Sequence, residues 1–273
     1  MLRRTYIPDY SIDKQKQIVH VLSKYDELIS NNKKRILVLE KMISELYKEW
    51  FIRFRYSGFE NKDKHKIPDG WKYIKFDELC DYQRGISYSS EDLIENENSV
   101  NLINLKNLRD YGGFRKENIK SFSGDYKENQ KLNKGDLIMG ITEMVQERRI
   151  IGYCALIPTY SNFCVMSADL IKIISDYNNY YLYCCFTYGF YSKCFSNFGN
   201  GTNVIHLRPS SLKNIKILVP PKSLVDQFAS IVSSYFEEID LLQLKNENLE
   251  NQKNMLLPRL IFGNLDTNGK EII

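Results

Sequence analysis

The chain has 273 residues, of which 43% are hydrophobic and 26% are charged, and its formal net charge is +4. These values are ordinary for a folded globular protein of one or two domains. No run of about 18 apolar residues is present, which excludes a transmembrane helix, and the apolar stretch within residues 1–8 is too short for a secretory signal, so we expect a cytoplasmic protein. The mildly basic charge permits binding to nucleic acid without requiring it.

The first predicted element is one long helix from about Ser11 to Phe54, within a first region that spans residues 1–57. Its apolar residues recur at alternating steps of three and four, which is the heptad repeat of a coiled coil. The repeating positions are Leu22, Tyr25, Ile29, Ile36, Leu39, Ile43, Leu46 and Trp50. Asn32 occupies the one polar position of this seam, and a single seam asparagine specifies the register of a coiled coil.

The middle region, residues 58–218, has short apolar runs of strand length separated by turns that contain glycine or proline. The runs are 72–74, 100–105, 136–141, 150–157 and 170–174. We expect one short aromatic-rich helix over 180–195 and a closing strand over 215–219. The pattern predicts an α+β fold whose middle domain is mostly β.

The last region, residues 219–273, contains a second long helix from about Ser223 to Leu260. Its seam positions are Ile239, Leu242, Leu249, Leu256 and Leu260, and Asn246 lies on the same seam. Lys253 occupies another seam position, so this repeat is less regular than the first. Pro258 is expected to end or kink the helix.

The two long helices resemble each other in sequence. Ile18-Val19 matches Ile231-Val232, and the seam isoleucines of the first helix match Leu242, Leu249 and Leu256 at one constant offset. A diverged repeat on each side of a middle domain predicts a pseudo-symmetric arrangement. The alternative is that any two heptad helices can be aligned by their seam residues.

Motifs for catalysis or metal binding are missing. There is no phosphate-binding Gly-rich loop ending in Gly-Lys-Ser/Thr, and Val219-Pro220-Pro221-Lys222 lacks the polar and aromatic residues of an adenine methyltransferase motif. His206 is interpreted as a polar loop residue and not as a general base. The six cysteines form no CxxC pair and only three histidines are present, so we expect reduced, mostly buried thiols, no metal site and no cofactor.

Several motifs follow one another in a specific order along the chain. They are Pro68-Asp69-Gly70-Trp71, Gln83-Arg84-Gly85-Ile86-Ser87, Gly135-Asp136-Leu137-Ile138, Ile151-Gly152, Gly201-Thr202, Ile215-Lys216-Ile217-Leu218-Val219-Pro220-Pro221 and Leu256-Leu257-Pro258-Arg259-Leu260. In this order they resemble the specificity subunit of type I restriction–modification systems. Each motif is weak alone, but together they cover nearly the whole chain.

The resemblance implies a mostly-β target recognition domain and two long antiparallel spacer helices that form a coiled coil. It implies a non-catalytic subunit, acting away from membranes, that binds double-stranded DNA and directs methyltransferase subunits, and in some assemblies a motor-nuclease subunit, to a target sequence. Full-length members carry two target domains and two spacer helices, whereas this chain begins at a helix and has one domain. It therefore resembles half of such a subunit or a single-domain form, and pairing as a homodimer or with another half-subunit would restore two target domains.

A target domain of this kind reads base edges through amides, hydroxyls and arginines. The candidates for DNA contact lie in polar, turn-rich segments, and they are Gln83, Arg84, Ser87, Tyr88, Ser90, Lys106, Asn107, Arg109, Thr142, Gln146, Arg148, Arg149, Asn200, Thr202, Asn203 and His206. Arg84 and the pair Arg148–Arg149 are favoured, because arginine binds guanine through two hydrogen bonds or grips phosphate. For each candidate the alternative is an ordinary solvated loop residue.

The end of the first helix carries three aromatic residues, Tyr47, Trp50 and Phe51. As large side chains at a helix end, they are expected to anchor a partner subunit. The alternative is that they pack on the target domain.

Two other functions stay open at this point. One is a coiled-coil interaction protein whose middle domain binds another protein or inhibits a restriction enzyme, and salt-sensitive DNA binding separates it from a DNA reader. The other is an enzyme with an unrecognised nuclease site, which metal-dependent cleavage by the purified chain would reveal.

Overall fold

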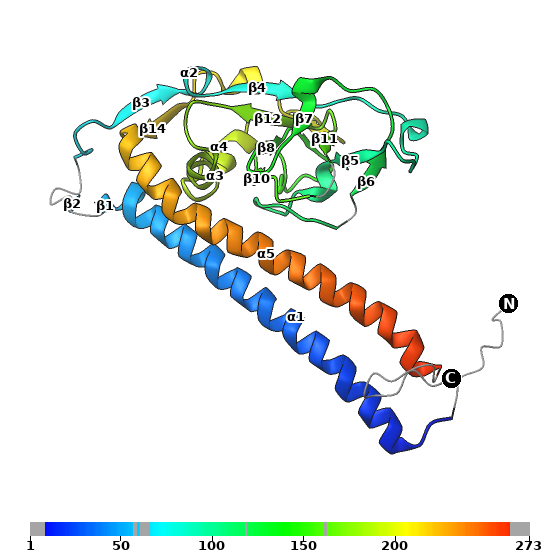
Figure 1. The fold of residues 1–273 in the computed structure, drawn as a ribbon. Coiled ribbons are helices and arrows are strands. Elements are labelled where there is room, and N and C mark those ends of the chain that lie inside the picture. The colour runs from blue at the N-terminus through cyan, green and yellow to red at the C-terminus, as the bar shows by residue number, and fades with distance from the viewer. Residues whose placement is uncertain (1–8, 57–58, 61–65, 118, 161–162, 263–273) are drawn as a thin grey trace. The chain divides into compact units, whose positions relative to one another are not determined.

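The computed structural model describes residues 9–56, 59–60, 66–117, 119–160 and 163–262 (Figure 1). The chain divides into two compact units, which are a helical unit of residues 1–42 and 235–273 and a domain unit of residues 43–234. The regions expected from the sequence are 1–57, 58–218 and 219–273. The boundary between residues 57 and 58 lies outside the described residues, as do residues 1–8. The compact units divide the chain within its two long helices, and the expected region boundaries stay predictions.

These two helices are α1 (Ile12–Tyr47) and α5 (Lys222–Ile261). In the helical unit they run side by side in Figure 1. Side-chain pairs join them: Asp26 with Lys253, Asn32 with Asn246, and Arg35 with Glu238. The residue numbers rise along α1 as they fall along α5, so the helices are antiparallel, as the resemblance implied.

The predicted seam lies between the helices. Ile29 and Ile36 of α1 are buried, as are Ile239 and Leu242 of α5. Asn32 donates a hydrogen bond from Nδ2 to Oδ1 of Asn246 at 2.9 Å, so the two seam asparagines satisfy each other. A paired amide at one level disfavours other registers, because a slip would leave buried amides opposite apolar side chains.

Pro258 neither ends α5 nor breaks its hydrogen bonding beyond the proline. The helix continues to Ile261, and the Phe262 amide donates to the Pro258 carbonyl at 2.9 Å. Proline removes its own N–H donor and crowds the turn that precedes it, so the hydrogen bonds that follow it can still form.

The domain unit contains two four-stranded sheets within its described residues. The first has the order β10-β8-β12-β4 with all neighbours antiparallel, and the second has the order β6-β5-β11-β7 with β5 and β11 parallel. The strands of the first are β4 (Asp81–Arg84), β8 (Leu137–Gly140), β10 (Cys154–Leu156) and β12 (Leu170–Ile174). The strands of the second are β5 (Val100–Ile103), β6 (Lys120–Phe122), β7 (Lys131–Leu132) and β11 (Cys164–Met166).

Shorter elements complete the domain unit. Its two-stranded ladders are β1 (Arg55–Tyr56) with β2 (Phe59–Glu60), β3 (Lys72–Lys75) with β14 (Lys216–Val219), and β9 (Thr142–Glu143) with β13 (Ile205–His206). Its helical segments are a π-helical turn at Lys48–Ile52, α2 (Phe76–Leu79), α3 (Asn179–Tyr188), α4 (Tyr191–Ser196) and 3-10 turns at Ser90–Asp92, Leu105–Asn107, Glu128–Gln130 and Pro209–Leu212. The expected α+β class with a mostly-β domain is confirmed.

The apolar runs at 136–141 and 170–174 contain strands that are covered on both faces. All four residues of β8 are buried, and β12 is buried at Leu170, Ile171 and Ile173. A continuous apolar run, without polar alternation, is the pattern of a strand that is buried on both faces.

One predicted helix is wrong in its extent. Residues 180–195 form parts of two helices, α3 and α4, because the chain turns at Gly189 and Phe190. Phe190 has φ 65°, a left-handed conformation that ends a helix. A Cβ on Gly189 would lie 2.3 Å from the Cys185 carbonyl oxygen.

The aromatic residues at the end of α1 are buried inside the domain unit. Tyr47, Trp50 and Phe51 are 3%, 8% and 4% exposed. Phe51 lies 4.9 Å from Phe228 and 5.2 Å from Tyr181 between ring centroids. Burial raises the pKa of Tyr47 well above its ordinary value. The expectation that these three side chains anchor a partner subunit is therefore corrected, since the chain's own residues already cover them.

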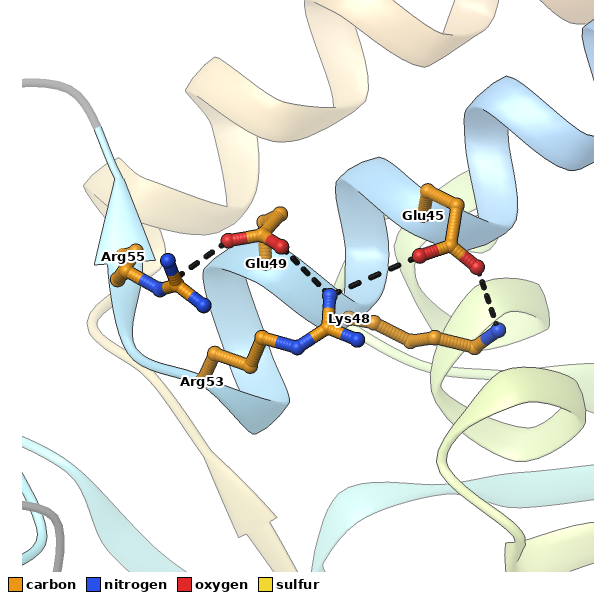
Figure 2. Close-up of polar contacts among 5 residues, drawn as sticks. All are labelled: Glu45, Lys48, Glu49, Arg53 and Arg55. Atoms are coloured by element: carbon orange, nitrogen blue, oxygen red, sulfur yellow. Dashed lines mark hydrogen bonds and ion pairs between the residues drawn. The ribbon is translucent and has the colours of Figure 1, made fainter.

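A network of ion pairs joins the end of α1 to β1 (Figure 2). Lys48 binds Glu45 at 2.9 Å, Arg53 binds Glu49 at 2.5 Å and Glu45 at 3.6 Å, and Arg55 binds Glu49 at 3.2 Å. The hydrogen bond from Lys48 is the largest influence that lowers the pKa of Glu45. Exposed pairs of this kind each stabilise little, so we assign the network a local role in holding the turn after the helix.

Five of the six cysteines are buried, and Cys194 is exposed. Burial raises the pKa of Cys80 to about 12 and those of Cys164 and Cys185 to about 11. Since the thiolate is the reactive form, the buried thiols are protected both by coverage and by protonation.

We therefore expect one thiol per folded chain to react with a disulfide reagent at pH 8, and all six to react after denaturation. Peptide mapping should place the first label on Cys194. Burial raises these thiol pKa values, so the folded chain is favoured while the thiols stay protonated. This contribution to the free energy of unfolding is fully present below the unfolded-state pKa of about 8.5 and is lost as the pH rises toward about 11–12. Rapid labelling of Cys80 or Cys185 in the folded chain would contradict the buried arrangement.

Candidate nucleic-acid interface

Three loops of the domain unit come together, and we call them the loop cluster. They are residues 109–113, 142–150 and 199–206. Pairing of β9 with β13 joins the bases of the second and third loops, and Gln146 Nε2 donates to the Thr202 carbonyl further out. The Tyr111 amide donates to the Arg149 carbonyl at 2.7 Å, which attaches the first loop to the second.

The loop cluster gathers most of the polar candidates from three distant parts of the chain. They are Arg109, Thr142, Gln146, Arg148, Arg149, Asn200, Thr202, Asn203 and His206. Amides, hydroxyls and guanidinium groups are the side chains that read base edges. The tertiary structure thus produces one polar surface from segments that are not adjacent in sequence.

The third loop is closed by a short backbone ladder. The Asn200 amide donates to the His206 carbonyl at 3.0 Å, and the His206 amide donates back to the Asn200 carbonyl at 2.9 Å. Gly201 has φ +145°, and a Cβ there would lie 1.9 Å from the Val204 carbonyl oxygen, so this turn requires glycine. The exposed candidates on it are Asn200, Thr202, Asn203 and His206.

The second loop carries the favoured arginine pair. Arg148 has φ 52° and donates from Nη1 to the Ser196 carbonyl at 3.0 Å. Arg149 lies 3.3 Å from Asp110 of the first loop, and this hydrogen bond is the largest influence that raises the pKa of Arg149. Each guanidinium has five N–H donors, so both arginines keep donors for a ligand while they fasten the loops.

Two candidates are corrected by their burial. Asn107 is 0% exposed, and its side chain accepts from the Asn104 amide and donates to the carbonyls of Arg115 and Glu117. Thr142 is 5% exposed, with Oγ1 3.3 Å from His206 Nδ1. Both side chains are buried and contact other residues of the chain, so neither is exposed to a ligand.

Arg109 is half-buried and folds back over its own loop. A Cβ on Gly113 would lie 2.4 Å from one of its guanidinium nitrogens, so the glycine leaves the space that the guanidinium fills. Gly113 itself has φ +98°. Arg109 therefore packs against the first loop and is not extended toward solvent.

The other candidates are not brought to the loop cluster. Gln83, Arg84, Ser87, Tyr88 and Ser90 lie on β4 or follow it. In the first sheet Arg84 pairs with Ile171, which pairs with Met139 of β8, so Arg84 lies two strand spacings, or about 10 Å, from the end of β8 that leads into the second loop. Gln83 accepts a hydrogen bond from Asn129, and the Tyr88 ring lies 5.6 Å from Lys120 Nζ. Arg84 is exposed, so its guanidinium is accessible to a ligand.

Lys106 lies on the 3-10 turn Leu105–Asn107 and is exposed. The side chain of Asn104 accepts from its backbone amide at 2.9 Å, which fixes the turn. Its ammonium group is thus presented from an ordered segment.

Sequence reasoning missed several residues in and beside the loop cluster. Lys193 and Arg208 are exposed cations; Lys193 is on α4, the helix that receives the Arg148 hydrogen bond, and Arg208 follows β13. Met144 and Val145 are 65% and 44% exposed. Glu143 is only 3% exposed, and no local pattern distinguishes a buried loop carboxylate from a solvated one.

Two other kinds of site are absent from the described residues. Nowhere among them do three or more His, Cys, Asp or Glu side chains converge in a way that could hold a metal ion. No helix in the described part of the chain combines the length and hydropathy needed to cross a bilayer.

A family model described as "Type I restriction modification DNA specificity domain" matches residues 68–251. The chain belongs to this family. The match covers more than half of the chain and includes all three loops of the loop cluster, so the polar surface lies within the specificity domain. The family resemblance drawn from the ordered motifs is thereby confirmed.

Similar proteins agree with this assignment. The chain is 26% identical to the type I restriction enzyme MjaIX specificity subunit of Methanocaldococcus jannaschii, over 97% of this chain and 61% of that protein. It is 24% identical to the MjaVIII specificity subunit of the same organism, over 95% and 62%. The chain thus spans less than two thirds of the length of these relatives.

The fold resembles that of a solved specificity subunit. The crystal structure of the type I restriction–modification system S subunit from M. genitalium matches with a TM-score of 0.61 and 15% identity, over 92% of this chain and 61% of that chain. At this identity the match supports the fold alone.

Proposed function

We propose that this chain is a DNA-specificity subunit with one target recognition domain, and that its loop cluster reads base edges in double-stranded DNA. The observation that carries the proposal is the joining of three separate loops into one surface of exposed amides, hydroxyls and arginines. Hydrogen bonds between the loops hold these groups in place before DNA binds, which reduces the entropy that binding would otherwise lose.

The loop cluster is polar and not strongly basic. Its exposed or half-exposed charges are those of Arg109, Asp110, Glu147, Arg148 and Arg149. Such a mixture suits base reading, whereas phosphate contacts come from cations around it. Lys193, Arg208 and Lys106 are suitable in charge and exposure for that role.

We further propose that catalysis belongs to a partner methyltransferase, and that a motor-nuclease subunit joins it in a restriction complex. The relatives are named as specificity subunits of restriction enzymes, and a specificity subunit supplies target choice. On the helical unit, Leu37 and Val38 of α1 are 64% and 58% exposed. Exposed apolar residues on a helix suit a protein partner, and they replace the buried aromatic residues as the proposed contact.

We also propose that a second copy of this chain or another half-subunit pairs with it to supply a second target domain. A helix of 40 residues, such as α5, extends about 60 Å. This length is comparable with the separation of half-sites one or two turns of DNA apart. Sedimentation that shows only monomer at micromolar concentration, with and without DNA, would count against pairing.

The direct test is co-expression with a cognate methyltransferase subunit, followed by mapping of methylated bases. We expect methylation at one defined sequence that disappears when this chain is omitted. Salt-sensitive binding of the complex to that sequence is also expected. Methylation without a sequence preference, or salt-insensitive binding, would favour a protein-interaction role instead.

Replacing Arg149 by alanine is expected to weaken binding to the target sequence found by methylation mapping. The expected loss is about 1–3 kcal/mol, because a guanidinium bound to a base or phosphate is lost from the loop cluster. Affinity should be measured by fluorescence anisotropy at fixed salt. Arg53→Ala is the matched control, since Arg53 is a half-exposed arginine bound to Glu45 and Glu49. Equal losses in the two variants would remove Arg149 from the reading surface.

A further inference from the structure

The tip of the second loop exposes apolar residues on a conformation fixed from below. Met144 and Val145 are 65% and 44% exposed, directly after Glu143, which is 3% exposed. Isolated exposed apolar side chains are common on proteins. Here two adjacent ones stand beside base-reading side chains on an ordered loop, and this combination calls for an explanation.

The Glu143 carboxylate closes the loop. Its Oε1 accepts hydrogen bonds from the amides of Met144 at 2.9 Å and Val145 at 3.3 Å, and its Oε2 accepts from the Ile150 amide at 2.8 Å. One carboxylate thus binds both ends of the loop. Burying a charge is unfavourable unless hydrogen bonds compensate it, and here three backbone N–H groups do so.

The rest of the loop is held in an uncommon backbone conformation. Arg148 has a positive φ of 52°, and its guanidinium is bound to the carbonyl that Ser196 presents from α4. Gln146 is bound to the third loop. With its flanking residues fixed in this way, the Met144–Val145 tip is displayed at one position relative to the polar groups of the loop cluster.

We propose that Met144 and Val145 contact the C5-methyl group of a thymine in the major groove, and that Glu143 is the positioning residue that holds them there. The inference rests on the proposed function. Apolar side chains recognise thymine through this methyl group, while neighbouring amides and arginines read the adjacent bases in the same groove. The sequence read by the chain therefore contains a T·A pair at the position that the tip reaches.

The test is deletion of that single methyl group. The full chain with its methyltransferase partner is titrated with duplexes of the mapped sequence, in which each thymine is replaced in turn by deoxyuridine. Loss of one buried methyl group should weaken binding about fourfold, at one thymine position and not at the others. In the double variant Met144→Ala/Val145→Ala, binding should be weaker and that position should tolerate deoxyuridine as well as thymine.

Glu143→Gln tests the positioning role. The amide keeps the side chain's size, but its NH2 group faces backbone N–H donors, so the loop should lose its fixed conformation. The ratio of affinities for the thymine and deoxyuridine duplexes should then fall from about four toward one. Glu78→Gln is the control, because Glu78 is an exposed carboxylate on α2, outside the loop cluster, and it should keep the preference. A purely structural role of Glu143 would lower the Tm and leave the thymine-to-deoxyuridine ratio unchanged.

The outcomes separate the inference from the proposed function. Specific binding that tolerates deoxyuridine equally at every thymine would overturn the methyl contact while leaving DNA reading intact. The double variant could also bind DNA as the wild type does but fail to associate with the methyltransferase. That result would assign the tip to a protein partner and would overturn the methyl contact. Failure of the wild-type complex to prefer any sequence would overturn both.

Discussion

Replacing Phe51 by alanine is expected to lower the free energy of unfolding by about 3–5 kcal/mol, which is typical of removing a buried aromatic side chain. Phe51 is 4% exposed in the domain unit. The rings with centroids within 6.1 Å of its own are Tyr47, Trp50, Trp71, Tyr181 and Phe228. Alanine would leave a cavity that these neighbours cannot all close, because they pack on one another as well.

Urea unfolding followed by far-ultraviolet circular dichroism measures this loss. The matched control is Ile52→Ala, one residue further along the same turn and 48% exposed, for which a change below about 0.5 kcal/mol is expected. If Phe51→Ala were as stable as the wild type and instead failed to associate with a methyltransferase subunit, the residue would be a partner anchor after all.

Gly85→Ala is expected to destabilise the domain unit by about 3 kcal/mol or more, at the upper end of overpacking effects. A Cβ on Gly85 would lie 2.0 Å from the Ser167 carbonyl oxygen and 2.5 Å from that of Met166. These atoms are backbone, so no side-chain rotation relieves the overlap. The clash would separate the segment after β4 from the Met166–Ser167 segment, where the Ile86 amide donates to the Met166 carbonyl at 2.8 Å.

Thermal and urea unfolding again provide the measurement, with Gly135→Ala as the comparison. Gly135 has φ +81°, but the nearest atom to its Cβ would be the Tyr180 hydroxyl at 3.8 Å. Only backbone strain of about 1–2 kcal/mol is expected there. A larger loss at Gly135 than at Gly85 would show that conformation, and not close approach, decides which glycines this domain requires.

The glycine pair illustrates a limit of sequence reasoning. Gly85 was identified only as part of a family motif, and the structure shows that it is needed because another backbone segment passes against it. That segment is more than 80 residues away in the chain, and no local pattern reports such an approach. Gly201, by contrast, lies in a turn whose local contacts within the loop require glycine.

The sequence by itself determined the two long helices and their seams, with Asn32 on one and Asn246 on the other, because a heptad repeat is local and its buried face follows from spacing alone. The pairing of these two asparagines came from the structure. It also determined the α+β class and the family, since apolar runs and motif order can be read along the chain. Only the tertiary structure decided which polar residues form a surface. Asn107 and Thr142 are polar like their neighbours, yet they are buried, and Phe51 faces the chain's own core. Whether a loop residue meets solvent, another loop or a buried carboxylate such as Glu143 depends on strands distant in sequence, and that information is not local.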